Sequence, residues 1–447
     1  MGQVSKKQGS RRGLSRREFL TRSAMASTMA AASPYIIPAS ALGADGNTAP
    51  SNRIVMGCIG VGSQGTSNLK WFLGNNDTQF VAVCDVDRAH RENAQQIINE
   101  TYGNSDCKGY NDFRELLERD DLDALSIAVP DHWHAIPAIA GAKKGLDMYA
   151  EKPLSLTIPD GIAMVEAVEG SKVVWQTGSW QRSKAHFRFA CEIVRSGRIG
   201  KVHTVEVGLP TGSPIEPQPA MPIPEGFDYD RWLGPAPEAP YTEKRCHWNF
   251  RWILDYSGGQ LTDWGAHHCD IANWGMDTEG TGPIWVEGVG AFPREGLWTA
   301  ATDYHFTARY GKNQSSVSPN GFEMKVANTA TYPMGAKFIG EKGWVHVSRK
   351  GLETGPDSLK STVIGDKDVQ LYDSKDHVRN FLECVRSRQE TITPIRVAHR
   401  AISIAHLGNI AMRMGRAIQW DPVAQRLVDD PAAERLFDRA KRGQWHL

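Results

Sequence analysis

The chain has 447 residues, with 51 Lys and Arg against 51 Asp and Glu, for a formal net charge of zero. Residues 1–44 hold seven of the basic side chains and one acid, so the remainder has 44 basic and 50 acidic residues and a net charge of −6. This balance excludes a protein built around a basic nucleic-acid surface, and no nucleic-acid partner is expected. Because single hydrophobic cores stop growing near ~250–300 residues, the length predicts two domains.

The first 44 residues have the order of a twin-arginine export signal. Residues 15–20 read SRREFL, a weakly apolar alanine-rich stretch follows, and residues 39–41 offer a small-residue cleavage site. The alternative is a disordered basic tail that contains Arg-Arg. No cysteine precedes the cleavage point, and no later stretch reaches the ~18 apolar residues that span a bilayer. We expect an exported, periplasmic protein with no membrane anchor.

A glycine-rich turn follows the first apolar segment. Residues 54–59 form an apolar run of strand length, and Gly60, Gly62 and Gly65 follow with the spacing G-x-G-x-x-G. Such glycines allow a tight turn, the approach of a pyrophosphate to the backbone, and close packing of the next helix. The amino terminus of that helix attracts an anion. The pattern predicts a dinucleotide site, and the alternative is a glycine turn in some other α/β protein.

Asp85 ends a second apolar strand, twenty residues after the last of these glycines. Its carboxylate is placed to accept both hydroxyls of an adenosine ribose. Because a carboxylate repels the 2′-phosphate of NADP, NAD is the expected cofactor, although Arg88 keeps NADP open. Free NAD is not expected to be replenished outside the cytoplasm. We therefore expect a tightly held cofactor that is regenerated within each catalytic cycle.

Strands and helices alternate through the first part of the chain. The predicted strands are 54–59, 79–84, 124–129, 147–150 and 173–176, and the predicted helices are 64–73, 88–101, 111–118, 134–144 and 159–169. This alternation indicates a parallel, doubly wound sheet. We expect a Rossmann NAD(P)-binding domain at 53–176.

The pattern then changes to successive strands. The predicted strands are 203–209, 284–291, 302–310, 322–331, 336–340 and 344–348, and the predicted helices lie near 375–388 and 396–418. Residues 210–247, rich in proline and aromatic side chains, are expected to form a long ordered loop. The predicted fold is α/β: a Rossmann domain, then an α+β substrate and oligomerisation domain at 177–395 with a large open, mainly antiparallel sheet. Residues 396–447 should pack back on the core as a helix and tail.

Two motifs follow strands at the carboxyl edge of the first sheet, where ligands bind in such folds. Residues 128–134 read AVPDHWH, and an ordinary loop with a capping Asp131 is the alternative to a site. Residues 151–153 read EKP, and Pro153 fixes the backbone just past Lys152. A partly desolvated lysine beside a nicotinamide can exchange a proton with a substrate hydroxyl. The alternative is a solvated surface lysine.

A third motif, SGGQLTDWGAHHCD at 257–270, places two polar residues one helical turn apart. Asp263 and His267 should share one face of a helix that starts after the two glycines. A carboxylate there can fix the tautomer of the imidazole, and the pair can remove a hydroxyl proton as hydride leaves the carbon. The alternatives are a helix cap, a buried core histidine, and a metal site that adds His268 and Asp270. The run lacks the supporting ligands of a common zinc pattern, so no metal is expected.

Tryptophans are concentrated in the middle of the chain, where five fall within 43 residues. They interleave with polar side chains: Trp232, Trp248, Trp252, Trp264 and Trp274 alternate with Arg231, Arg245, His247, Asn249 and Arg251. Aromatic faces suit the C–H faces of pyranose rings, and the polar groups suit hydroxyls. The alternative is an aromatic core for the loop. We expect one or two of these rings to face the site.

These motifs, in this order, resemble the family of glucose–fructose oxidoreductase, inositol dehydrogenase and rhizopine-catabolism proteins (Gfo/Idh/MocA). The resemblance covers nearly all of the chain after residue 44. It implies an open sheet often used for oligomer contacts, and hence a homo-oligomer. It also implies Lys152, Asp263 and His267 as the catalytic set, with His267 as the proton acceptor. Asp131 stands where many members have asparagine, which leaves that cofactor contact open.

The expected binding residues fall into two groups. Cofactor contacts are expected from Gly60, Gly62, Ser63, Gln64, Gly65, Asp85, Pro130, Asp131, His134, Glu151 and Lys152. Substrate contacts are expected from Trp133, Trp180, Arg182, Trp264 and His268.

The resemblance implies redox chemistry on sugars, cyclitols and their derivatives. Exported members of the family include glucose–fructose oxidoreductase, which keeps its nicotinamide cofactor bound, and certain distant relatives are glycosidases. The leading hypothesis is an exported NAD(P)-dependent oxidoreductase that acts on a sugar, glycoside or cyclitol by hydride transfer. A second hypothesis is a glycosidase or lyase that uses NAD as an internal redox relay. A third is a binding or sensor protein without catalysis, which the intact catalytic set argues against.

Overall fold

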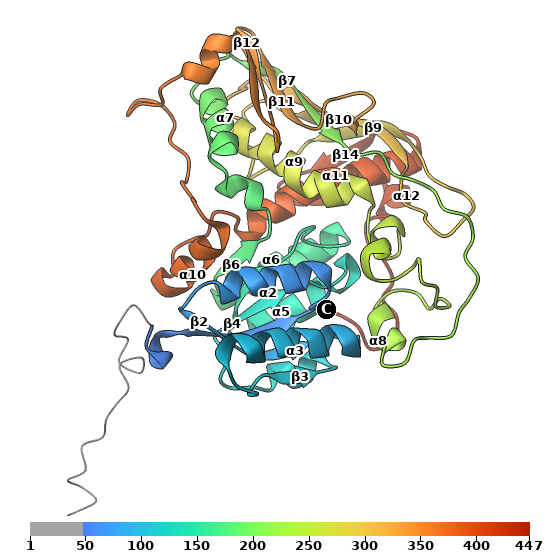
Figure 1. Ribbon diagram of the computed structural model, residues 1–447. Coiled ribbons are helices and arrows are strands. Elements are labelled where there is room, and N and C mark those ends of the chain that lie inside the picture. The colour runs from blue at the N-terminus through green and yellow to red at the C-terminus, as the bar shows by residue number, and fades with distance from the viewer. Residues whose placement is uncertain (1–47) are drawn as a thin grey trace, which may run out of the picture. The chain divides into compact units, whose positions relative to one another are not determined.

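The computed structural model describes residues 48–447, and the expected export signal at 1–44 lies outside the described residues. Residues Ile54–Leu447 form one compact unit, to which the following description applies. It contains two sheets, separated along the chain and joined by helices (Figure 1).

The first sheet is the parallel, doubly wound sheet that the sequence predicts. Its strands are β1 (Ile54–Ile59), β2 (Thr78–Cys84), β3 (Lys108–Tyr110), β4 (Ala124–Ile127), β5 (Asp147–Ala150) and β6 (Trp175–Thr177). They run in the order β3-β2-β1-β4-β5-β6, and every pair is parallel. All residues of β4 and β5 are buried, because helices cover both faces of such a sheet. Those helices are α2 (Ser63–Leu73), α3 (Arg88–Tyr102), α4 (Phe113–Leu117), α5 (Ala135–Lys143) and α6 (Ile158–Ser171).

The second sheet has nine strands and is mainly antiparallel, which confirms the predicted fold class. Its strands are β7 (Val202–Leu209), β8 (Trp285–Ala291), β9 (Asp303–Tyr310), β10 (Phe322–Asn328), β11 (Gly335–Gly340), β12 (Gly343–Ser348), β13 (Gly351–Gly355), β14 (Ile418–Asp421) and β15 (Arg426–Leu427). The order is β13-β12-β11-β7-β10-β9-β8-β14-β15, and only the β7–β10 pair is parallel.

Helices cover one face of the second sheet and leave the other open. Buried and exposed residues alternate along β9, as expected for a strand with one covered face. The covering helices are α7 (Ala185–Arg195), α9 (Gln260–Met276) and α11 (Ile395–Met414), which lie on the side of the sheet nearer to the first domain (Figure 1). The carboxyl edge of the first sheet therefore faces the start of α9.

The chain returns to the first sheet through α10 (His377–Ser387), earlier than the boundary that the sequence suggests at residue 396. Phe381 packs edge-on against Phe72 and Tyr149, at centroid distances of 5.9 and 6.0 Å. Two arginines of this helix, Arg379 and Arg386, both pair with Asp77 in the turn before β2. The helix thus completes one face of the nucleotide-binding domain.

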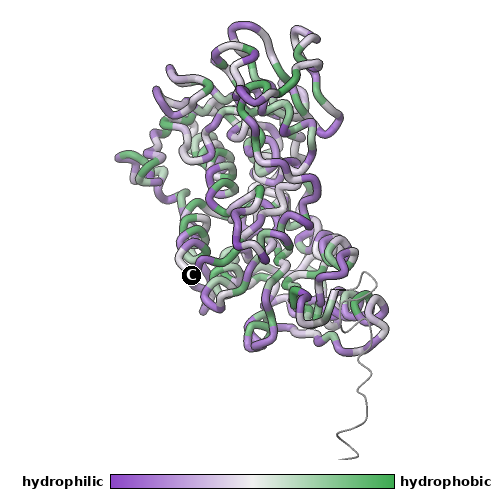
Figure 2. Tube along the Cα trace, turned by 90° about the vertical axis from the view of Figure 1, so that its left-hand side faces the viewer, coloured by the Kyte–Doolittle hydropathy of each residue, from purple (hydrophilic) through white to green (hydrophobic). Residues whose placement is uncertain are grey.

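The remaining elements are short. They include α8 (Tyr229–Leu233), α12 (Pro431–Glu434) and the 3-10 turns η3 (Asp131–Trp133), η4 (Trp180–Ser183) and η5 (His247–Trp252). All seven cysteines lie within the described residues, and each is buried and free. In the part of the chain from residue 48 onward, no helix has the length and apolar character to cross a membrane. Hydrophobic stretches along the trace are short and alternate with hydrophilic ones (Figure 2).

Candidate active site

A cavity of about 680 Å³ runs along the carboxyl edge of the first sheet. Residues that follow five of its strands line the cavity: Gly60, Asp85, Pro130, Lys152 and Trp180, after β1, β2, β4, β5 and β6. The opposite wall comes from η5, the first two turns of α9 and the turn after β12. The cavity therefore joins the two expected binding regions, the glycine turn and the Asp263–His267 helix.

Each of the three positions in the turn is glycine for a different structural reason. Gly60 has a φ of +82°, and a Cβ there would lie 2.5 Å from the Ala128 carbonyl oxygen. A Cβ on Gly65 would lie 2.1 Å from the Gly60 carbonyl oxygen. Gly62, by contrast, caps α2 with φ −66°, and its Cβ would meet only the His90 ring, at 3.5 Å. Packing of the protein requires glycine at 60 and 65, whereas at 62 only a ligand at the helix amino terminus does, which fits a pyrophosphate.

Asp85 lies at the same end of the cavity and is held by the backbone. Its Oδ2 accepts a hydrogen bond from the Val61 amide at 2.8 Å, and its Oδ1 accepts one from the Asp87 amide at 2.9 Å. Each carboxylate oxygen keeps a lone pair for a further donor. The Asp85 carboxylate, 3.7 Å from Nδ1 of His90, raises the pKa of that histidine. The geometry fits recognition of the ribose hydroxyls.

Within residues 48–447, one group of three side chains has the spacing of metal ligands. Donor atoms of Asp87, His90 and His247 all lie within 4.8 Å of one another. The first two belong to the start of α3, and His247 opens η5. Burial lowers the pKa of His247. The group lies beside Asp85, far along the chain from the metal alternative raised by the 257–270 motif.

Glu151 links β5 to the glycine helix. Its Oε1 accepts hydrogen bonds from Asn68 Nδ2 at 3.1 Å and from Gln64 Nε2 at 3.4 Å. The side chain is buried, and burial raises the pKa of Glu151. Glu151 and Gln64 both line the cavity, as does Ser63. Their contacts fix the glycine helix against the strand that carries Lys152.

Lys152 forms an ion pair with Asp263. Its Nζ lies 2.6 Å from Asp263 Oδ1, and Arg251 Nε lies 3.4 Å from the same oxygen. Burial alone would raise the pKa of Asp263, but the charges of Lys152 and Arg251 outweigh it and lower that pKa. The three side chains come from the turn after β5, from η5 and from the first turn of α9, and all three line the cavity.

His267 lines the cavity beside this pair but is not bonded to Asp263. Its Nδ1 has no hydrogen-bond partner, and its ring is buried. Burial, then the positive charges of Lys152 and Arg349, hold the pKa of His267 well below its usual range. The expectation that Asp263 fixes the tautomer of His267 is therefore wrong, because the carboxylate turns toward the two cations. The imidazole is neutral near pH 7 and able to accept a proton.

Two residues of the 128–134 motif form hydrogen bonds within the fold and contribute little or nothing to the cavity wall. His134 Nδ1 lies 2.6 Å from the Pro153 carbonyl oxygen and Nε2 lies 2.8 Å from that of Val129, and the ring does not line the cavity. It braces the turn that carries Lys152 rather than contacting a cofactor. Trp133 donates from Nε1 to the Trp232 carbonyl at 2.9 Å and packs on Trp445, so only a small part of it reaches the wall.

Asp131 and Pro130 line the cavity at the switch between β1 and β4. The Asp131 carboxylate accepts a hydrogen bond from Ser257 Oγ at 2.5 Å. It is buried, and burial raises the pKa of Asp131. This contact joins the rim of the first domain to the segment just before α9.

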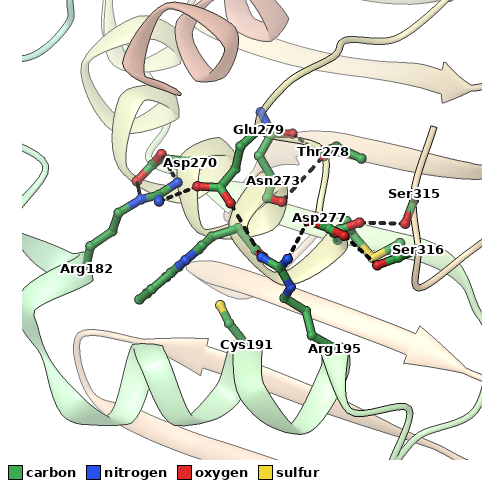
Figure 3. A network of polar contacts seen from close by, with 12 residues as sticks. Arg182, Cys191, Arg195, Asp270, Asn273, Asp277, Thr278, Glu279, Ser315 and Ser316 are labelled. Carbon is green, nitrogen blue, oxygen red and sulfur yellow. Dashed lines mark hydrogen bonds and ion pairs between the residues drawn. The ribbon is translucent and has the colours of Figure 1, made fainter. Parts of the chain in front are cut away.

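Two residues predicted to bind substrate lie outside the cavity. Arg182 is buried and donates to Asp270 from Nε and Nη2, at 2.7 and 2.8 Å, and to Glu279 from Nη1 at 2.5 Å (Figure 3). This network engages Asp270, so the metal alternative with His268 is not formed. His268 stacks on Trp264 with centroids 5.6 Å apart, and burial lowers its pKa to about 3. Proximity in sequence to the motifs explains both wrong predictions.

Trp180 and Trp264 do line the cavity, and an arginine that the sequence does not single out lies between them. The Arg349 Cζ is 4.6 Å from the ring centre of Trp180 and 4.3 Å from that of Trp264. Arg349 follows β12, 79 residues after the end of the 257–270 motif, and no local pattern marks it. Trp248 and Trp252, from η5, also contribute to the wall.

Comparisons with known proteins place this arrangement in a family. The chain is 34% identical over 128 residues to glycosyl hydrolase family 109 protein 1 of Shewanella sp. (strain MR-4), covering 28% of each protein. It is 32% identical over 152 residues to myo-inositol 2-dehydrogenase of Thermotoga maritima, covering 34% of this chain and 44% of that one. The alignments thus span less than half the length of these curated relatives.

The fold is shared with solved dehydrogenases. The WlbA dehydrogenase of Bordetella pertussis, crystallised with NADH and UDP-GlcNAcA, superposes with a TM-score of 0.58 at 19% identity, over 83% of this chain and 99% of that one. Two family models also match: the oxidoreductase-family NAD-binding Rossmann fold at residues 54–179, and its C-terminal alpha/beta domain at 193–295 and 355–447. The chain therefore belongs to the Gfo/Idh/MocA oxidoreductase family, with an NAD-binding Rossmann domain at its first sheet.

Proposed function

We propose that this protein is an exported enzyme that moves hydride between a carbohydrate or cyclitol and a tightly held NAD. The observation that carries the proposal is the single cavity that runs from the glycine turn to Lys152, Asp263 and His267. Tryptophan faces line its far end, where a sugar ring would lie. The export signal at 1–44 supplies the location.

The glycine turn and its neighbours would hold the dinucleotide. Gly62, Ser63 and Gln64 present the amino terminus of α2, and Asp85 presents a carboxylate at the ribose end. Asp85 favours NAD over NADP. NAD held by these residues would supply a hydride acceptor for a carbinol carbon, or a hydride donor in the reverse direction.

Three residues at the centre of the cavity have separate roles toward the substrate hydroxyl. His267, neutral and on the cavity wall, takes the hydroxyl proton of the substrate. The Lys152 ammonium donates a hydrogen bond to the same substrate oxygen and stabilises the negative charge that develops there. Asp263 holds Lys152 in place rather than orienting His267. Holding these groups close to a bound sugar in the reactive geometry lowers the entropic part of the activation barrier.

A loop closes over the nucleotide end and supports slow cofactor release. The Arg88 amide donates to the Gly226 carbonyl at 2.9 Å, and the Asp228 amide donates to the Val86 carbonyl at 3.0 Å. Asn111 Nδ2 donates to Asp228 Oδ2 at 2.7 Å. These bonds join the 210–247 loop to the edge at β2 and β3, beside Asp85. A dinucleotide beneath the loop would leave only when these bonds open.

Mass spectrometry of the small molecules released from the purified, unfolded protein tests the proposal. Purification without added cofactor should yield close to one NAD per chain, and absorbance at the NADH band should then change when a substrate sugar is added. A protein that carries no nucleotide and binds none would exclude the enzyme proposed here.

A redox-relay glycosidase or lyase is the second candidate, favoured by the similarity to glycosyl hydrolase family 109 proteins. Transient oxidation of a sugar acidifies the neighbouring C–H bond and permits elimination of the aglycone. A screen of chromogenic glycosides without added NAD separates the two: cleavage without an external oxidant indicates the relay, and net NADH accumulation indicates the dehydrogenase.

Copies of the chain should associate through the open face of the nine-stranded sheet. Val289, on β8, is 71% exposed there, and the helices cover only the opposite face. Light scattering should give a mass of at least two chains, and Val289→Lys should reduce it.

A further inference from the structure

We propose that the substrate is an acidic sugar whose carboxylate, as in a uronic acid, binds the guanidinium of Arg349. The inference rests on the proposed function and names the substrate class of the same cavity. It comes from the way in which Arg349 is held and from the lack, among residues 48–447, of a carboxylate paired with it.

Arg349 is fixed in place before any ligand arrives. Its guanidinium lies between the Trp180 and Trp264 rings, with Cζ 4.6 and 4.3 Å from their centres. Its Nε donates to the amide oxygen of Gln181 at 3.1 Å, and the Gln181 nitrogen donates to the His267 carbonyl at 3.2 Å. Two aromatic faces and one hydrogen bond therefore set the plane of the guanidinium, which leaves Nη1 and Nη2 to a ligand.

The guanidinium lacks an acidic partner within the described residues. Burial lowers the pKa of Arg349, and the more distant charge of Asp263 compensates only in part. Arg182 shows the contrast: it too lies beside a tryptophan, but it is buried, and Asp270 and Glu279 occupy all three of its nitrogen positions (Figure 3). Arg349 is exposed at the cavity wall, so its terminal nitrogens are open to an anion that comes from outside the chain.

The charges around the far end of the cavity agree with this reading. Lys152 and Arg251 share the one carboxylate of Asp263, so the three cations there face a single ion-paired acid. The two other acids nearby, Asp131 and Glu151, are buried, and burial raises the pKa of each. The excess of positive charge favours an anionic substrate over a neutral one.

The position of Arg349 also suits the reaction. The Trp180 and Trp264 rings that hold it lie 6.4 and 5.7 Å from the His267 ring, centre to centre. A carboxylate on Arg349 would therefore anchor one edge of a sugar ring while a hydroxyl of the same ring reaches His267. The planar fork of an arginine matches a carboxylate with two parallel hydrogen bonds, which a sugar hydroxyl cannot provide.

Matched sugars and matched variants test the proposal. Glucuronate and galacturonate are compared with glucose and galactose, and with glucose 6-phosphate as the other anion. Arg349→Met removes the charge and keeps an apolar stem, whereas Arg349→Lys keeps the charge and loses the fork. The control is Arg309→Met, because Arg309 also stacks on a tryptophan, Trp285 at 3.9 Å, but lies outside the cavity and pairs with Glu323.

The wild-type enzyme should prefer the uronate by ~10²-fold in kcat/KM, mainly through KM. Arg349→Met should remove that preference by raising KM for the uronate far more than KM for the neutral sugar, while the NAD content stays that of the wild type. Arg349→Lys should be intermediate, and Arg309→Met should match the wild type. Equal use of neutral and acidic sugars by the wild type, or a preference that survives Arg349→Met, would overturn the inference. A preference for the phosphate would overturn the carboxylate assignment.

Calorimetry separates this inference from the proposed function. If no sugar is turned over while NAD remains bound, the proposed reaction fails, but glucuronate binding can still be measured on the same protein. Uronate binding that depends on Arg349 would then stand by itself. If Arg349→Met unfolds, Arg349→Lys and the wild-type sugar preference decide the outcome.

Discussion

The two ends of the cavity are built in different ways. The nucleotide end consists of backbone: the turn at 60–65, the amino terminus of α2 and a carboxylate held by two amides. The substrate end consists of side chains from four separate segments, which bring Lys152, Arg251, Asp263 and Arg349 together. A backbone site can be encoded by one short contiguous motif. A side-chain site needs the whole fold, and it can vary without any change in the nucleotide site.

The largest effect should come from breaking the ion pair at the centre of the cavity. Lys152→Met should reduce turnover by ~10²-fold or more while NAD stays bound. It also strands the buried Asp263 carboxylate with Arg251 alone, so the unfolding temperature should fall. Kinetics, nucleotide content and calorimetric unfolding are measured on the same preparation.

The double variant Lys152→Met with Asp263→Asn is the matched control. Removing both charges should recover stability but not turnover, and the double-mutant cycle should show strong coupling in stability. Near-normal turnover in Lys152→Met would remove this lysine from the mechanism.

Two alanine substitutions in the glycine turn should have smaller effects, one on NAD binding and the other on stability. Gly62→Ala should weaken NAD binding by roughly tenfold, about 1.4 kcal/mol, because the added methyl group occupies ligand space and touches only His90. Unfolding of the cofactor-free protein should not change. Gly65→Ala should instead lower the stability of the cofactor-free protein by about 1–3 kcal/mol, since its Cβ meets the Gly60 carbonyl. Titration with NAD and thermal unfolding distinguish the two variants, and the opposite pattern would contradict the assignment.

The smallest expected effect concerns His268, just outside the substrate end. Both ring nitrogens lack hydrogen-bond partners, and burial lowers the pKa of His268 from 6.5 to about 3. Below about pH 6.5, His268 is therefore protonated in the unfolded chain but not in the folded protein. The free energy of unfolding of the wild type falls as the pH drops from there toward 3. His268→Phe should unfold like the wild type at about pH 8 and be more stable by roughly 1 kcal/mol at about pH 5.5.

Thermal unfolding across this pH range measures the difference, with His203→Gln on the exposed side of β7 as the control. A His268→Phe variant that is less stable at both pH values would show that the ring makes polar contacts.

Most of the fold could be predicted because its strands and helices have clear periodic patterns. The apolar segments of the first part of the chain give five of the six strands of the first sheet, and the bounds agree within a few residues. The helices and strands that escaped prediction are β3, α7, α8, α12, β13, β14 and β15. The four strands have two to five residues and the helices α8 and α12 have five and four, which is too short for a periodic signal. The helix α7 does have a clear apolar face, which the prediction missed.

Prediction of the site failed where a partner lies far away in sequence. Spacing along a helix correctly puts Asp263 and His267 on the cavity wall, but it cannot show that Lys152 and Arg251 take the carboxylate. Arg349 follows a plain strand and has no motif. His134 and Arg182 neighbour the motifs, yet their bonds to the backbone and to Asp270 remove them from the cavity. Burial and long-range pairing, which only the folded chain shows, decide these cases.

The position of α10 has a consequence for dissecting this protein. Phe72 and Tyr149 are covered by Phe381, and Asp77 is neutralised by two arginines more than three hundred residues downstream. A fragment that stops near residue 179, although it contains every strand of the nucleotide-binding sheet, would expose aromatic rings and an unpaired acid. The nucleotide-binding domain is thus completed only when the last quarter of the polypeptide has been synthesised.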